Sequence, residues 1–232
     1  MMFSDQFYNL ISAKYQKIAK ERSAYISTVN QVIIDHCSQG NVASWLDVGT
    51  GDGLRILSIL SRTNSISRIS VVEPSLKMLN VCKEHLRHLS HHVDYFNCSI
   101  EAFPATEEHD LITCLWNVIG HSSDPFIFLK SIRENMTINS LAIFDCNNSF
   151  NIRQYKLDAI RNMLKALLRP KELLSFKLSK CGYSTNVRIL NPFQITSLLK
   201  RAGFSEWKLF YIDYTTGRPT SSCCGQMLVL AW

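Results

Sequence analysis

The chain has 232 residues, a formal net charge of +6 and a hydrophobic fraction of 46%, values that are ordinary for a globular protein of one domain. Because no apolar run approaches the roughly 20 residues that a membrane-spanning helix needs, we expect no contact with membranes. The first residues contain no basic segment followed by an apolar one. We therefore expect no secretory signal and a cytoplasmic protein, present as a monomer or homodimer.

Cysteine and histidine are the residue types that most often indicate a structural metal. The chain has eight cysteines but no Cys-x-x-Cys pair, so we expect reduced thiols that are mostly buried. Four histidines, His85, His88, His91 and His92, recur at helical spacing. No cysteine or acidic residue joins them at ligand spacing, so we expect them to lie near the C-terminal end of an exposed helix and predict no metal site.

Apolar periodicity predicts an alternation of helices and strands along the chain. Residues 3–38 are expected to form two helices. The remaining helices are expected at 74–86, at 124–136 with Asp124 as N-cap, at 156–168 and at 193–201, besides the one at 54–60. Strands are expected at 43–48, 69–73, 93–98, 110–116, 141–146, 207–212 and 226–232, with a further one at 185–190.

This alternation predicts the fold class. It indicates an α/β protein with a doubly wound, Rossmann-like sheet of seven strands, mostly parallel, with helices on both faces. Residues 215–224 leave no room for a helix, so the last strand should run antiparallel. We expect a single domain over 1–232, with 1–40 as an N-terminal helical cap and 149–190 as an insertion that closes over a ligand.

A glycine-rich turn follows the first predicted strand, in the segment LDVGTGDG at 46–53. It differs from the dinucleotide pattern G-x-G-x-x-G because Gly53 comes one position early. Asp47 and Asp52 oppose a pyrophosphate but suit an ammonium group. Glu73 closes the next strand, where a carboxylate can accept hydrogen bonds from both hydroxyls of a ribose. An amino acid joined to a nucleoside fits these features.

The order of motifs resembles the class I S-adenosylmethionine-dependent methyltransferases of the small-molecule type. The segments that carry the resemblance are FYNLISAKYQKI, LDVGTGDG, VVEPS, NCSIEAFP, HDLITCLWNVIGH and LAIFDCNN. The resemblance implies S-adenosylmethionine as cofactor, with S-adenosylhomocysteine as product. It also implies that the cofactor is bound by Asp47, Gly49, Thr50, Gly51, Gly53, Glu73, Pro74, Met78, Ser99, Ile100 and Trp116. The chain departs from the family at Cys98, where many members have an aspartate that binds adenine.

Three residues are candidates for the chemistry at the acceptor. Asn117 and His121 directly follow the fourth strand, in a segment that resembles glycine-type N-methyltransferases. His121 has an ordinary pKa suited to accepting a proton near neutral pH, and its alternative role is structural. Tyr15, from the segment that resembles the family's opening helix, contacts the cofactor or is an ordinary core aromatic.

These patterns predict in-line methyl transfer from S-adenosylmethionine to a nitrogen or oxygen of a small-molecule acceptor. One alternative is an RNA or DNA methyltransferase, suggested by the positive charge. It is disfavoured because WNVIGH replaces the Asn/Asp-Pro-Pro-Tyr/Phe segment of many base-methylating enzymes. A second alternative is a non-catalytic, cofactor-binding partner subunit. The sequence leaves the acceptor itself open.

Overall fold

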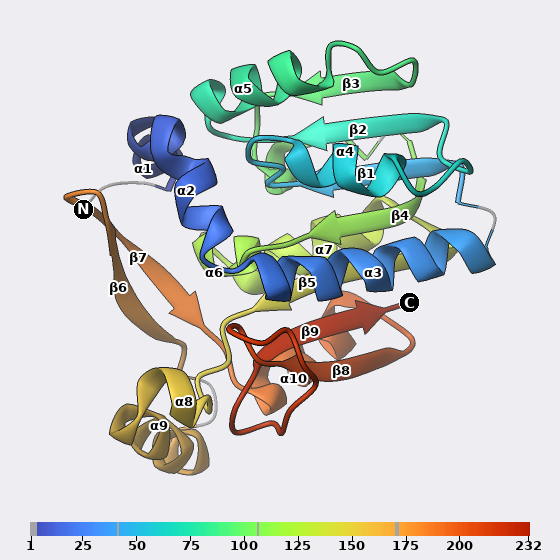
Figure 1. Cartoon of the computed structure of the whole chain (residues 1–232). Helices are drawn as coiled ribbons and strands as arrows, with labels where there is room; N and C mark the ends of the chain where they lie inside the picture. The colour runs from blue at the N-terminus through green and yellow to red at the C-terminus, as the bar shows by residue number, and fades with distance from the viewer. Residues whose placement is uncertain (1–3, 41, 106, 170–171) are drawn as a thin grey trace.

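A central sheet of seven strands organises the molecule (Figure 1). The computed structural model describes residues 4–40, 42–105, 107–169 and 172–232. The strand order is β3-β2-β1-β4-β5-β9-β8. Only β9 runs antiparallel to its neighbours, β5 and β8, which confirms the predicted fold class. The strands are β1 (Ser44–Val48), β2 (Arg68–Val72), β3 (His92–Phe96), β4 (His109–Cys114), β5 (Met136–Cys146), β8 (Trp207–Ile212) and β9 (Gln226–Ala231).

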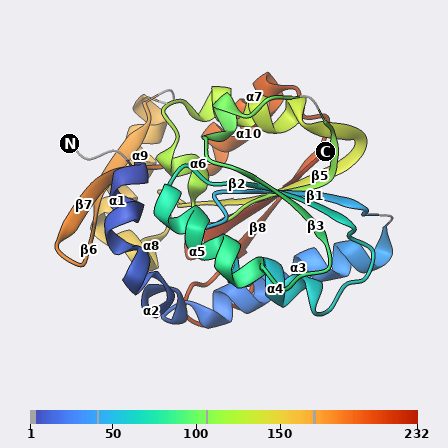
Figure 2. The ribbon, with the colours of Figure 1, turned by 90° about the horizontal axis from the view of Figure 1, so that it is seen from above.

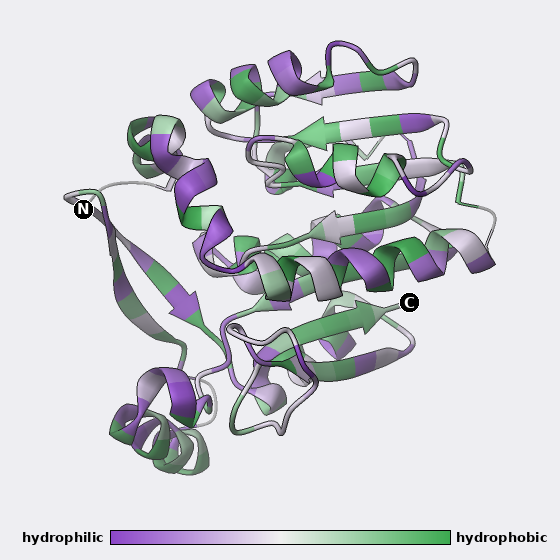
Figure 3. Cartoon of the chain, in the orientation of Figure 1, coloured by the Kyte–Doolittle hydropathy of each residue, from purple (hydrophilic) through white to green (hydrophobic). Residues whose placement is uncertain are grey.

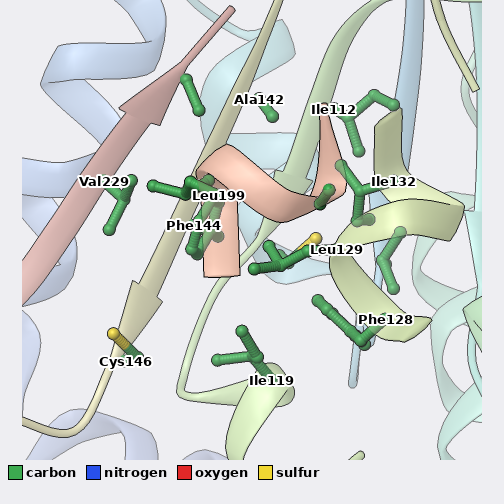
Figure 4. Packing of buried hydrophobic residues seen from close by; sticks show 14 of the residues in the cluster. Ile112, Ile119, Phe128, Leu129, Ile132, Ala142, Phe144, Cys146, Leu199 and Val229 are labelled. Carbon is green, nitrogen blue, oxygen red and sulfur yellow. The ribbon is translucent and has the colours of Figure 1, made fainter. Parts of the chain in front are cut away.

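Helices cover both faces of this sheet (Figure 2). One face packs against α3 (Ser23–Gln39), α4 (Leu54–Leu60) and α5 (Leu76–Leu86), and the other against α6 (Val118–His121), α7 (Pro125–Glu134) and α10 (Pro192–Ala202). Successive side chains of a strand point to opposite faces, so Trp45 joins the first apolar cluster and Leu46 the second. Figure 4 shows the second cluster, in which Phe144 packs near Leu199.

Polar side chains cap the N-termini of α5, α7 and α10. Asp124 caps α7 through a bond from the Phe126 N–H, as predicted, and Asn191 forms a capping box with Gln194 at the start of α10. The prediction that α5 begins at Pro74 was wrong. Ser75 is the N-cap of α5, because its hydroxyl accepts a hydrogen bond from the Met78 N–H.

The N-terminal segment contains more helices than predicted. Its described part forms α1 (Ser4–Ile11), the 3₁₀ turn η1 (Ser12–Lys14) and α2 (Tyr15–Lys20) before α3, rather than two helices in all. The hydroxyl of Ser12 donates to the Asn9 carbonyl, a side-chain bond that competes with a regular helical ladder. The break lets α1 and α2 turn across the carboxyl ends of the parallel strands (Figure 1).

The segment 149–190 also holds an element that the periodicity missed. It contains α8 (Ile152–Tyr155), α9 (Leu157–Leu168) and a separate hairpin of β6 (Leu174–Lys180) and β7 (Tyr183–Ile189). The helix at 156–168 was predicted, but of the two hairpin strands only β7 was, because the serines and lysines of β6 resemble a polar loop. Figure 3 shows alternating hydrophobic and hydrophilic residues along α9, whose leucines at 157, 164, 167 and 168 are exposed.

The described residues contain no helix with the length and hydropathy of a membrane span. In the same part of the chain, no group of three or more histidine, cysteine or acidic side chains is arranged to hold a metal ion. All eight cysteines are free thiols. His85, predicted to decorate an exposed helix, instead has its Nδ1 atom 2.7 Å from the Asp52 carbonyl oxygen.

Candidate functional site

The glycine-rich turn connects β1 to α4 at the carboxyl edge of the sheet. Gly49, Gly51 and Gly53 all have positive φ, at 67°, 66° and 76°. The Gly49 N–H donates to the Val72 carbonyl, which ties the turn to β2. A Cβ atom at Gly49 would lie 2.5 Å from Cγ2 of Val118. This position therefore requires glycine for both its backbone conformation and its space.

Glu73 lies directly against the turn. Its carboxylate accepts hydrogen bonds from the backbone N–H of Gly51 at 3.0 Å and of Ser75 at 2.8 Å. Burial raises its pKa to about 7, an effect that the two backbone bonds oppose. A carboxylate has about four lone-pair sites, so two remain for a ligand's hydroxyl groups. This geometry fits the predicted ribose contact.

Asp47 is buried at the end of β1. Its Oδ1 atom accepts a hydrogen bond from Thr113 Oγ1 on β4 at 2.5 Å, and Trp45 Nε1 donates to the same threonine at 2.7 Å. Thr50 Oγ1 donates to the Asp47 carbonyl at 2.9 Å and closes the turn. Burial raises the pKa of Asp47, while Thr113 and the charge of Arg55 oppose this shift. The carboxylate is therefore held in one orientation by its neighbours.

Three cavities meet near the turn. The glycine-turn cavity, of about 70 Å³, is bordered by Gly49, Gly51, Glu73, Pro74, Met78 and His121. The hairpin cavity, of about 150 Å³, lies against the β6–β7 hairpin. The α3–α4 cavity, of about 370 Å³, reaches Thr50, Asp52 and Arg55. Tyr15 and Trp116 border all three cavities, with ring centroids 5.4 Å apart.

Two residues expected at the adenine do not border these cavities. Ile100 is buried in the apolar cluster beneath α7, and Ser99 is exposed at the start of the 3₁₀ turn η2 (Ile100–Ala102). In the described part of the chain, neither borders the three cavities. Gly53 also does not border the three cavities. It is the N-cap of α4 and has a left-handed backbone conformation.

The backbone after β4 is strained. Trp116 and Asn117 have φ of 76° and 59°, a conformation that costs non-glycine residues about 1–3 kcal/mol each. Asp145 holds it in place, because its Oδ1 atom accepts a hydrogen bond from the Asn117 N–H at 2.5 Å. Its other oxygen accepts a bond from the Tyr25 hydroxyl at 2.6 Å. The sequence did not decide the role of Asp145. It also did not indicate the contact with Tyr25, which lies 120 residues away in the chain.

The same turn presents unpaired donors. The Asn117 Oδ1 atom accepts a hydrogen bond from the Asn147 N–H at 2.8 Å. In contrast, Nδ2 of Asn117 and Nε1 of Trp116 are buried without a hydrogen-bond partner. Buried polar groups are usually hydrogen-bonded, so two unpaired donors in residues that border the hairpin cavity are unusual.

His121 connects the turn to the N-terminal helix. Its Nδ1 atom lies 2.8 Å from the Ser4 hydroxyl, and its Nε2 atom lies 3.2 Å from the Tyr8 hydroxyl. Burial lowers the pKa of His121 to about 4, so the imidazole is neutral at pH 7. These contacts hold α1 beside the glycine-turn cavity. Ser4 and Tyr8 were not predicted, since nothing in the local sequence indicates a contact across more than 110 residues.

The hairpin cavity has walls from three separate parts of the chain. One wall comes from α1, α2 and the start of α3, and a second from the ends of the sheet strands, with Trp116, Asn117 and His121. The third comes from the hairpin, with Phe176, Leu178, Lys180 and Val187. The N-terminal segment and the 149–190 insertion thus enclose the cavity together.

Part of the chain matches a known domain family. Residues 46–137 match the family model described as "Methyltransferase domain". The chain is 26% identical over 172 residues to a ubiquinone biosynthesis O-methyltransferase of Nitrosomonas europaea. The match covers 73% of this chain and 66% of that relative's length.

Solved structures share the fold. A methyltransferase from Clostridium acetobutylicum, described as S-adenosylmethionine-dependent, superposes with a TM-score of 0.65 at 14% identity, covering 97% of this chain and 98% of that one. A 1,6-didemethyltoxoflavin-N1-methyltransferase of Burkholderia thailandensis, bound to S-adenosylhomocysteine, gives a TM-score of 0.68 at 10% identity, with coverage of 98% and 85%.

Proposed function

By its domain and its fold the chain is a class I S-adenosylmethionine-dependent methyltransferase, and we propose that it methylates a nitrogen or oxygen of a small-molecule acceptor. The observation that carries the proposal is the glycine-rich turn facing Glu73, with the enclosed hairpin cavity beyond Trp116. The fold class and the cofactor are those of the family. The acceptor and the roles of individual residues are our proposal.

The residues at the turn fit S-adenosylmethionine. Gly49 and Gly51 leave space for a ligand against the backbone, and the Glu73 carboxylate has lone pairs free for ribose hydroxyls. In our proposal Asp47 orients the ammonium group. Pro74 and Met78 border the glycine-turn cavity, and in our proposal they flank the nucleoside. The bound cofactor supplies a methyl group on a sulfonium.

In our proposal, cofactor binding requires Tyr15 and Trp116, which lie between the three cavities, to move apart. The glycine-turn cavity of about 70 Å³ is smaller than the roughly 300 Å³ of a typical small-molecule site. Because Tyr15 lies on α2 and borders all three cavities, movement of the N-terminal helices would join them. We propose that residues 1–40 act as a cap that moves during binding, and that 149–190 closes the acceptor side.

Alignment is the main contribution expected from the acceptor side. In-line displacement needs the nucleophile opposite the departing sulfur, and positioning alone removes roughly 7–11 kcal/mol of barrier. Asn117 borders the hairpin cavity, and its Nδ2 atom is buried without a hydrogen-bond partner. We assign Asn117 to acceptor positioning. His121 accepts a proton from the acceptor only if α1 releases it, since both ring nitrogens contact α1.

Two observations bear on the alternatives. A cavity of about 150 Å³ enclosed by apolar and aromatic side chains favours a small acceptor over a nucleic acid strand. The relative from Nitrosomonas europaea is named as an O-methyltransferase, and the Burkholderia structure as an N-methyltransferase. We therefore keep both oxygen and nitrogen as acceptor atoms.

The test is turnover of S-adenosylmethionine with a panel of small phenols, carboxylic acids and amines, followed by S-adenosylhomocysteine release. We expect at least one acceptor to be methylated, and Glu73→Ala to abolish activity while Glu84→Ala, on the exposed side of α5, does not. Methylation of RNA or DNA alone would favour the nucleic-acid alternative. Cofactor binding without turnover of any acceptor would favour the partner-subunit alternative.

A further inference from the structure

Arg22 stands at the junction of α2 and α3 and borders the hairpin cavity. It is half-buried, and its guanidinium carbon lies 3.7 Å from the ring centroid of Tyr214. The Tyr214 hydroxyl in turn donates to Asn147 Oδ1 at 3.2 Å. Stacking on a fixed aromatic ring holds a guanidinium group in one orientation.

The guanidinium of Arg22 has no acidic partner. In the described ranges of the chain it forms no ion pair and no side-chain hydrogen bond, although seven other lysine and arginine side chains form ion pairs. The neighbouring cation Lys180 differs, because its Nζ atom lies 3.4 Å from Glu21 Oε2. Arg22 therefore keeps its donors available on the cavity side.

The wall of the hairpin cavity carries positive charge. Its charged side chains are Arg22 and Lys180, and no carboxylate belongs to the wall among the described residues. His121 adds no charge near pH 7, because burial lowers its pKa to about 4. The buried Asp145 is engaged by Tyr25 and by the Asn117 N–H. The cavity is thus electrostatically suited to an anion.

The rest of the wall is suited to a flat apolar body. Phe7, Ile11 and Ile18 line it from the N-terminal helices, and Phe176 and Leu178 face them from β6. Such a surface excludes water, which strengthens a charge-assisted hydrogen bond formed inside it. The position of the Arg22 guanidinium then determines how a bound ligand is oriented in the hairpin cavity.

From this arrangement we infer that the acceptor is a small aromatic or similarly flat molecule with a carboxylate or other anionic group, and that Arg22 binds that group. This inference rests on the proposed function, because it assigns the hairpin cavity to the acceptor. Anchoring the anionic end at Arg22 leaves the opposite end of the molecule to meet Trp116 and Asn117.

The experiment uses the full chain saturated with S-adenosylhomocysteine and two probes of the same shape, benzoate and benzamide. Ligand-observed NMR titration gives the Kd of each probe. We expect benzoate to bind about 10-fold to 100-fold more tightly than benzamide, the range expected for hydrogen bonds to a charged group. Arg22→Met, which keeps an apolar chain over Tyr214, should reduce this preference to within about 2-fold.

Two further variants make the result specific. Arg22→Lys should keep part of the preference for benzoate, and Lys17→Met, which removes an exposed cation of α2, should keep all of it. S-adenosylhomocysteine affinity should stay within about 2-fold in all variants, which shows that they fold. No preference in the wild type, or a preference that survives Arg22→Met, overturns the assignment of Arg22. Failure of the wild type to bind S-adenosylhomocysteine would instead overturn the proposed function.

Discussion

The rings of Tyr15 and Trp116 lie with their centroids 5.4 Å apart, and together they separate the three cavities around the glycine-rich turn. Tyr15 comes from a helix that crosses the strand ends, whereas Trp116 is fixed by a strained turn after β4. One side of the partition can therefore move with its helix while the other stays in place. Access to the cofactor site should depend on the tyrosine ring.

Tyr15→Ala tests this partition. Removing the ring joins the glycine-turn cavity to its neighbours, so S-adenosylhomocysteine should associate and dissociate several-fold faster. Tyr15→Phe keeps the ring and serves as the control, with rates close to the wild type. Stopped-flow measurement of Trp fluorescence gives both rates. If the alanine and phenylalanine variants share the wild-type rates, Tyr15 does not control access.

Gly49→Ala tests the close approach of the turn to α6. The added Cβ atom would lie 2.5 Å from Val118 at a φ of 67°, so the variant suffers both backbone strain and a steric clash. Gly182→Ala is a matched control in the β6–β7 hairpin, with a φ of 84° and no heavy atom within 4 Å of the new Cβ. The control should lose only the roughly 1–2 kcal/mol of left-handed strain.

The readouts for this pair are urea unfolding and calorimetric binding of S-adenosylhomocysteine. Gly49→Ala should lose more stability than Gly182→Ala and at least about 10-fold in affinity, while the control binds normally. Equal affinities in the two variants would show that the turn does not contact the ligand.

Glu73→Gln tests the raised pKa of the carboxyl beside the turn. The folded-state pKa of about 7 lies above the ordinary value of 4.5, so folding is favoured by the protonated form. This stabilisation is present below pH 4.5 and is lost as the pH rises through 7, a change of about 3 kcal/mol for this buried group. The glutamine variant cannot titrate there.

The difference in unfolding free energy between wild type and Glu73→Gln should therefore change between pH 4.5 and pH 8, in the direction that weakens the wild type at high pH. Affinity for S-adenosylhomocysteine should change in the opposite direction, since the ionised carboxylate accepts ribose hydroxyls better. A stability difference that is independent of pH would contradict the assigned pKa.

Asp145→Asn tests what holds the strained turn at Asn117. Both oxygens of Asp145 accept hydrogen bonds from buried donors, and an amide can satisfy only one of them. We expect a loss of about 1–3 kcal/mol in urea unfolding and weaker acceptor turnover. Asp35→Asn, at an exposed position of α3, should change stability by less than about 0.5 kcal/mol. Equal stabilities of the two variants would remove Asp145 from this role.

Local patterns in the sequence predicted the sheet and the position of the glycine-rich turn. Alternate glycines, a strand-end Glu73 and the cap at Asp124 depend on neighbours within a few residues, and the structure has them where expected. The contact of Tyr8 with His121 and the stacking of Arg22 on Tyr214 join segments more than 100 residues apart. Periodicity contains no information about such contacts, so it could not predict which side chains line the hairpin cavity.

The central claim, that the turn at Gly49–Gly53 and Glu73 binds S-adenosylmethionine, is tested most directly by isothermal titration calorimetry with S-adenosylhomocysteine at pH 8. We predict one site per chain in the wild type, and an affinity at least about 10-fold weaker in Glu73→Ala, with Glu84→Ala unchanged. Absence of binding to the folded wild-type chain, or equal affinity in Glu73→Ala, would contradict the account.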